Sequence, residues 1–196
     1  VADAGVADIG FHATAEPLPS VPEVAIPPGQ PGQRTLYVNA ATGEDLRSAI
    51  DAQDPARPWR TIARAFASDG ATTGDTVLVA AGTYAEAVQI RKPGIVLRAV
   101  GEVVVTPPGG GTGLQIESPL VRVEGFTVRG GLHGIRAENA PLLTVRGCTL
   151  EGQSGNGIFV VQSDHATIDD NRVANAAALG IVVKRAGFAW LRNNLV

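Results

Sequence analysis

Short apolar segments recur at a nearly constant interval through the C-terminal half of the chain. One segment starts with glycine, continues with leucine or isoleucine and carries a further apolar residue two places later, with starts at Gly113, Gly134, Gly157 and Gly180. These starts lie 21, 23 and 23 residues apart. Two more columns keep this interval: Val123, Val145, Ile168 and Leu191, and then Val128, Leu150, Val173 and Val196. The pattern predicts a repeating unit that contains three short strands.

Strands this short cannot bury an apolar face alone, so the repeat predicts that successive turns of chain stack on one another. At the spacing of about 4.8 Å between paired strands, equivalent residues of successive turns form ladders. The inward ladders are expected to be Leu114, Ile135, Ile158 and Ile181, and Val123, Val145, Ile168 and Leu191. Leucine-rich repeats have a similar period, but their leucine–asparagine consensus is absent. The predicted fold is therefore all-β, a parallel β-helix solenoid.

Three zones of the chain differ in composition. We expect residues 1–15 to form a joining or capping segment, residues 16–35 a linker and residues 36–196 the β-helix domain. The linker contains six prolines, and proline fixes φ and lacks an N–H to donate. One helix is predicted from Pro58 to a stop at Gly70, with Trp59, Ile62 and Phe66 on one face. An apolar spacing also favours a shorter helix before it, at Leu46, Ala49 and Ile50.

Composition and charge exclude several classes of protein. The chain has 16 basic and 19 acidic residues, a net charge of −3 and no basic run longer than two residues, which argues against nucleic acid as a partner. No apolar stretch reaches the ~18 residues of a membrane span. The single Cys148 excludes an internal disulfide framework. Because the sequence contains no methionine, we expect a processed chain or a piece of a longer one.

Several segments resemble secreted right-handed β-helix proteins, a superfamily that includes pectate-lyase-like polysaccharide lyases, alginate epimerases and many uncharacterised surface proteins. They are Tyr37-Val38-Asn39, Pro58-Trp59-Arg60-Thr61-Ile62, Ala65, Gly74-Asp75-Thr76-Val77 and Ala81-Gly82-Thr83-Tyr84. The resemblance implies a right-handed coil, an N-terminal capping helix, and an extracellular or cell-surface location. It also implies that Asn171 and Asn194 close a tight turn, with Phe126 and Cys148 pointing inward in the same column.

In the enzymes of this superfamily, the outer face of the first strand carries the substrate. The outward positions are expected to be Gln115, Arg136, Phe159 and Val182, with Glu117, Glu138, Val161 and Lys184 two residues further on. A uronate lyase needs a base, and acids that hold calcium or neutralise the substrate. Glu117, Arg136 and Glu138 fit such a site, but an exposed ion-pair ladder is favoured. No catalytic residue is assigned, and the apolar members Phe159, Val161 and Val182 are predicted to form a contact surface.

A second acid-rich segment contains Asp164, Asp169 and Asp170, with Asp169 pointing outward and Asp170 at a turn. Carboxylate oxygens suit calcium, but a solvated turn is favoured because the Asp-x-Asp-x-Asp-Gly spacing is absent. The three histidines are scattered, which argues against a transition metal. No cofactor is therefore expected, with calcium as the one alternative. Phe159 and Trp190 are the candidates for stacking on a sugar.

Three functional hypotheses remain open at this point. The favoured one is a non-catalytic structural unit of a cell surface, fibre or adhesin-like filament. The second is a fragment of a polysaccharide lyase or epimerase that acts on uronate-containing glycans, an expectation that rests on fold alone. The third is a carbohydrate-binding module without chemistry. A polysaccharide is therefore one expected partner.

The structural hypothesis includes a mode of self-association. The segment around Val6, Ile9 and Phe11 resembles the terminal stretch that follows the last coils of related β-helix proteins. It is predicted to cover the open end near Leu191 and Val196 of a neighbouring domain by strand addition, with a disordered terminal tail as the equal alternative. That neighbour is either a second copy, which gives a head-to-tail filament, or the adjoining unit of a tandem chain.

Overall fold

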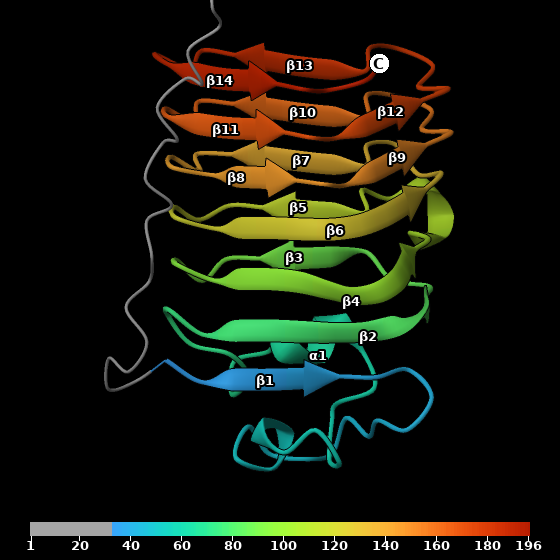
Figure 1. The fold of residues 1–196 in the computed structure, drawn as a ribbon, viewed down its shortest axis with the longest axis vertical. Coiled ribbons are helices and arrows are strands. Elements are labelled where there is room, and N and C mark those ends of the chain that lie inside the picture. Colours follow the sequence, from blue (N-terminus) through green and yellow to red (C-terminus); the bar gives the residue numbers. More distant parts are fainter. Residues whose placement is uncertain (1–32) are drawn as a thin grey trace, which may run out of the picture. The chain divides into compact units, whose positions relative to one another are not determined.

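Hydrogen bonds between strands one repeat apart build this molecule, and every strand pairing is parallel. The computed structural model describes residues 33–196, which form a parallel β-helix (Figure 1). One sheet has five strands, one per turn, so the solenoid makes about five turns. These strands are β3 (Val88–Ile90), β5 (Leu114–Ile116), β7 (Ile135–Glu138), β10 (Ile158–Val161) and β13 (Ile181–Lys184).

The second sheet has nine strands and holds the remaining two strand positions of each turn. In the early turns these two positions merge into one long strand, and in later turns they are separate. The strands are β1 (Thr35–Val38), β2 (Thr76–Tyr84), β4 (Val96–Val105), β6 (Arg122–Arg129), β8 (Thr144–Arg146), β9 (Thr149–Glu151), β11 (Ala166–Asp169), β12 (Arg172–Ala174) and β14 (Ala189–Arg192). Within residues 33–196 there is no helix long and apolar enough to cross a membrane.

The predicted inward ladders are confirmed. Ile158 pairs in register with Ile135 on one side and Ile181 on the other, and Ile168 pairs with Val145 and Leu191. Members of the ladders in the inner turns are fully buried. Leu191 is 49% exposed, because no described strand pairs with the far side of β14. The core therefore consists of stacked columns of aliphatic side chains.

The repeated glycines occupy a corner at which a side chain does not fit. A Cβ atom on Gly157 would lie 2.3 Å from Cγ1 of Val173 and 2.7 Å from the carbonyl oxygen of Gly180. The same conflict arises at Gly134, where Leu150 fills the corner. The glycine column is therefore fixed by close packing against the third strand of the same turn.

Asparagine side chains close the tight turn between the second and third strands, as the resemblance implies. Oδ1 of Asn171 accepts a hydrogen bond from the backbone N–H of Cys148 at 2.9 Å, and Nδ2 donates to the carbonyl of Val145 at 3.0 Å. Asn194 repeats the pattern one turn later by accepting from the N–H of Asn171. Cys148 lies inward and buried, and burial raises the pKa of its thiol to about 12. A reactive thiolate is therefore disfavoured at this position.

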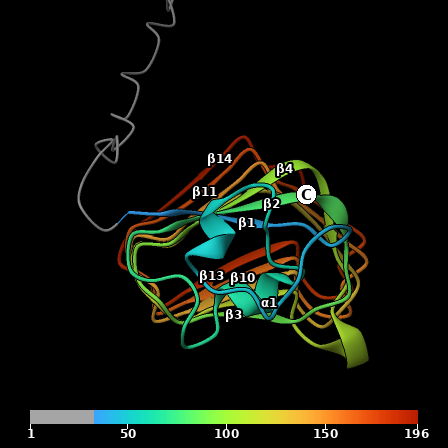
Figure 2. The ribbon, with the colours of Figure 1, turned by 90° about the horizontal axis from the view of Figure 1, so that it is seen from below.

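The predicted capping helix is much shorter than expected. Helix α1 covers only Ile62–Ala65, and two 3₁₀ turns, η1 (Asp51–Gln53) and η2 (Pro108–Gly110), complete the described helices. Trp59 does not begin the helix, because its backbone pairs with β1 by donating to Tyr37 and accepting from Asn39. The segment between β1 and β2 nevertheless lies over this end of the stack (Figure 2) and buries Trp59 and Ile62.

The shorter helix expected before it is also wrong. Leu46 is 93% exposed and Ile50 is 78% exposed, so their apolar spacing does not mark a buried face. The predicted domain boundary at residue 36 lies one residue after the start of β1. Residues 1–15 and most of the predicted linker, including Val6, Ile9 and Phe11, lie outside the described residues.

We expect Gly157→Ala to lower the free energy of unfolding by about 1–3 kcal/mol, since the added methyl group overpacks the corner. Chemical denaturation followed by circular dichroism measures this change. The matched control is Gly147→Asn, because Gly147 has open space around its Cβ position and the next turns carry Asp170 and Asn193 in the same left-handed conformation. The control should stay within about 0.5 kcal/mol of the parent. Equal losses in the two variants would contradict the steric explanation.

Candidate functional site

The outer face of the five-stranded sheet carries the predicted candidate residues in two columns. Gln115, Arg136, Phe159 and Val182 are in register, and Glu138, Val161 and Lys184 are in register beside them. Glu117 follows β5 at the foot of the second column. The expected register is therefore correct, and these residues share one surface.

The lower part of this face consists of ion pairs. Arg136 contacts Glu138 at 2.6 Å, and Arg91 contacts Glu117 at 2.8 Å. Hydrogen bonds from Arg91 and Gln115 hold the pKa of Glu117 below its ordinary value. Both carboxylates are thus engaged by neighbouring arginines, as expected for an ion-pair ladder.

The upper part of the face contains two stacked rings. His133 lies against Phe159 with ring centroids 5.3 Å apart and ring planes 19° apart. Nδ1 of His133 accepts a hydrogen bond from the backbone N–H of Asn156, so a neutral ring carries its proton on Nε2. Burial, and then the nearby Arg136 charge, lowers the pKa of His133. The amine of Lys184 lies 5.9 Å from the Phe159 centroid.

Sequence reasoning missed His133, although a signal was present. His133 precedes Asn156 by 23 residues, and Oδ1 of Asn156 accepts from the backbone N–H of Leu179 in the next turn. The corner is therefore a repeated cap, and a ring at this position is expected to lie beside the outward column of the sheet.

The predicted apolar contact surface is smaller than expected. Val182 is outward by register but only 8% exposed, so it adds little to this surface. Phe159 and Val161 are half-buried. The accessible part of this face is therefore the His133–Phe159 pair, with Arg136 and Lys184 beside it.

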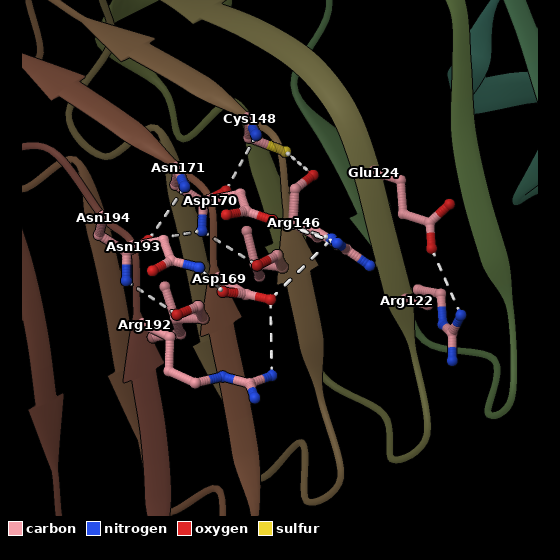
Figure 3. A network of polar contacts seen from close by, with 12 residues as sticks. Arg122, Glu124, Arg146, Cys148, Asp169, Asp170, Asn171, Arg192, Asn193 and Asn194 are labelled. Carbon is pink, nitrogen blue, oxygen red and sulfur yellow. Dashed lines mark hydrogen bonds and ion pairs between the residues drawn. The ribbon is translucent and has the colours of Figure 1, made fainter. Parts of the chain in front are cut away.

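Charges alternate in sign along one outward column of the nine-stranded sheet. The members in register are Arg98, Glu124, Arg146, Asp169 and Arg192. Arg98 contacts Glu124 at 2.6 Å. Asp169 contacts Arg146 at 4.0 Å and Arg192 at 3.5 Å (Figure 3). Glu124, Arg146, Asp169 and Arg192 each follow a member of the inward column that begins at Val123, and Arg98 follows Leu97, which pairs with Val123.

The three aspartates considered for calcium serve different partners. Asp169 belongs to the charge column, Asp170 contacts Arg146 at 3.2 Å, and Oδ1 of Asp164 accepts from the backbone N–H of Gly187. As predicted, Asp169 points outward and Asp170 lies at the turn, with φ of 56°. Over residues 33–196, no three His, Cys, Asp or Glu side chains gather in a group suited to a metal.

The two residues considered for sugar stacking lie on different faces. Phe159 belongs to β10 of the five-stranded sheet, whereas Trp190 belongs to β14 of the nine-stranded sheet. They cannot form one platform. Trp190 lies 5.9 Å from the ring of His165, which also contacts Phe188.

Residues 92–196 match the family described as the right-handed beta helix region, and the chain belongs to this family. Solved structures with the same fold include the pectate lyase Pel9A, with a TM-score of 0.55, 16% identity and coverage of 76% of this chain and 48% of that one. A rhamnogalacturonan lyase gives a TM-score of 0.55 and 14% identity, with coverage of 82% of this chain and 56% of that one. An alginate lyase from Paenibacillus gives a TM-score of 0.45 and 14% identity, with coverage of 78% of this chain and 65% of that one.

The chain spans about half the length of the first two solved structures that it matches. No curated protein matches it in sequence. Identities this low show the fold and leave the activity open. The chemistry of the face is therefore judged from the residues of this chain.

We expect His133→Asn to remove a pH dependence of stability. Asparagine keeps an acceptor for the N–H of Asn156, as Asn156 itself does one turn later. The ordinary histidine pKa is 6.5, and His133 lies below it when folded, so its contribution is present above this value and is lost as the pH falls toward the lowered pKa. Denaturation at about pH 7.5 and about pH 5.5 should show a larger loss for the parent than for the variant. Equal losses would contradict this assignment.

Proposed function

We propose that the β-helix domain binds an acidic, uronate-containing polysaccharide along the outer face of its five-stranded sheet. The observation that carries this proposal is the stacked pair of His133 and Phe159 with Arg136 and Lys184 beside it. We further propose that the protein acts outside the cell or at its surface, where such polymers occur.

The chemistry of the face suits this ligand. The C–H face of a sugar ring packs on an aromatic ring, which supplies apolar area in a fixed orientation. A carboxylate on that sugar is attracted by arginine or lysine, and a planar guanidinium also binds it in a bidentate manner. Because each turn repeats the strand at about 4.8 Å, the columns present their side chains as an extended surface to a linear polymer.

Binding is favoured over cleavage because the arginine of the face is already engaged by a carboxylate. A lyase base must be free to take a proton, and Arg136 is paired with Glu138 at 2.6 Å. Lys184 is the alternative base, and its amine lies over the Phe159 ring, 5.9 Å from the centroid. A lyase or epimerase activity is nevertheless the second candidate, since two solved structures with this fold are polysaccharide lyases.

The structural role favoured from the sequence gains less support than a carbohydrate ligand. Head-to-tail self-association through Val6, Ile9 and Phe11 remains a proposal. It is compatible with the exposed side chains of Leu191 and Val196 in the last described turn. Calcium is an optional part of the proposal, as a bridge between carboxylates of the sugar and the protein.

We expect Phe159→Ala to weaken binding of an oligogalacturonate about tenfold, through loss of the stacking area. Isothermal titration calorimetry of the full chain measures the affinity. Phe159→Tyr retains the ring and should bind like the parent. Arg136→Gln should weaken binding mainly at low salt, because it removes a charge that attracts the polymer.

The parent protein and an Arg136 variant also test the enzymatic alternative. Incubation with pectate or alginate and calcium, followed by the ultraviolet absorbance of unsaturated product, reports lyase turnover. Turnover that Arg136→Ala abolishes would replace the binding proposal with an enzymatic one. Affinity that is unchanged in Phe159→Ala would overturn the proposed binding face.

A further inference from the structure

The last described turn differs from the others in its net charge and in its aromatic side chains. Between residues 181 and 196 the charged residues are Lys184, Arg185 and Arg192, and there is no acidic residue. The same segment contributes Phe188 and Trp190. This turn thus combines basic and aromatic side chains, although the whole chain has a net charge of −3.

The aromatic side chains form an exposed cluster at the corner between the two sheets. Phe188 is 66% exposed and Trp190 is 48% exposed. Both lie beside His165 of the preceding turn, with ring centroids 5.6 Å and 5.9 Å apart. Three rings from two turns therefore present apolar surface to solvent.

Polar groups lie beside the cluster on the outer face of the nine-stranded sheet. Arg192 is two residues from Trp190 on β14 and is outward by the strand alternation (Figure 3). Its contact with Asp169, at 3.5 Å, leaves the guanidinium partly exposed, so further donors face solvent. In the adjacent strand Thr167 pairs in register with Trp190 and supplies a hydroxyl group.

The corner keeps bulky side chains at a conformational cost. His165 has φ of 58°, and Leu120 and Leu142 at the corresponding corners of earlier turns have φ of 61° and 60°. A second left-handed corner holds residues that favour this conformation, Gly147, Asp170 and Asn193, whereas a third holds Asn139, Gln162 and Arg185. His165 therefore holds its ring at this corner in a backbone conformation that glycine and asparagine adopt more readily.

We propose that His165, Phe188, Trp190 and Arg192 form a second binding site for an acidic sugar, separate from the His133–Phe159 face. The choice of an acidic sugar as the ligand rests on the proposed function. The sugar ring stacks on Trp190 or Phe188, and its carboxylate binds Arg192. The positive charge of the turn complements a polyanion, and Lys184 joins the two sites, because it reaches Phe159 and begins the corner that leads to Phe188.

Other polymers fit the cluster less well. Single-stranded nucleic acid also uses basic and aromatic groups, but it requires a groove of many cations, and this chain has a net negative charge. A protein partner would favour a broad apolar patch, whereas this cluster is beside a guanidinium and a hydroxyl group. The mixture of flat rings and dispersed hydrogen-bonding groups favours a sugar.

Intrinsic fluorescence separates the two sites. The chain has two tryptophans, and Trp59 is fully buried with its indole N–H donated to the carbonyl of Arg47. A ligand on the corner therefore changes the emission of Trp190 alone. We expect an oligogalacturonate to change the emission of the full chain in a saturable manner. A neutral oligosaccharide of the same length should bind about tenfold more weakly, because it lacks the carboxylates.

Matched variants locate the signal. Phe188→Ala and Arg192→Gln should each weaken the fluorescence-detected affinity about fivefold to tenfold. Leu120→Ala at the same corner of an earlier turn, and Arg98→Gln at the other end of the charge column, should leave it unchanged. Trp190→Phe should abolish the signal while calorimetry still detects binding.

The outcomes distinguish this inference from the proposed function. Calorimetric binding that Phe159→Ala weakens, without any change in Trp190 emission, would overturn the second site and leave the proposed function intact. A Trp190 signal together with overall binding that is insensitive to Phe159→Ala would support the second site and overturn the first. A single-stranded oligonucleotide that produces the signal when the oligogalacturonate does not would overturn the sugar assignment.

Discussion

The hydrogen bonds that join each turn to the next are the constraint on which the rest of this structure depends. A single turn cannot satisfy its own backbone, because its strands are too short and too far apart to pair with one another. The chain must therefore return to the same place after each repeat, and corners must keep their geometry from turn to turn. Glycine is required where a Cβ atom does not fit, as at Gly157, and asparagine where a backbone N–H needs an acceptor, as at Asn171.

This constraint leaves the outward positions free. The side chains of Phe159, Arg136 and Trp190 take no part in the inward columns, so the core tolerates different residues there. The outward residue of one strand can change without altering those of the adjacent strands, provided that the strand itself remains. The proposed polysaccharide surface thus has a different origin from the fold. The fold sets the spacing and direction of the outward side chains, and the residue at each outward position supplies the chemistry.

The columns could be predicted from the sequence because their residues repeat at the interval of the fold itself. Ile158 and Ile168 follow this interval, and the outward positions are known once the inward ones are. The 23-residue interval to Asn156 places His133 beside the sheet, but its stacking on Phe159 could not be predicted, because it also depends on side-chain direction. The capping helix was overestimated for a related reason. A long-range pairing with β1 takes up the backbone of Trp59, whose spacing alone favours a helix.

The alternating column of the nine-stranded sheet has a consequence for how such a solenoid grows. Its signs repeat every second turn, since Arg98, Arg146 and Arg192 alternate with Glu124 and Asp169. Removal of the turn that carries Arg146 would place Glu124 against Asp169, and duplication of any one turn would place like charges on adjacent strands. Lengthening or shortening by two turns keeps opposite charges on adjacent strands. The repeating unit of charge in this column is therefore a pair of turns, although the backbone repeats with every turn.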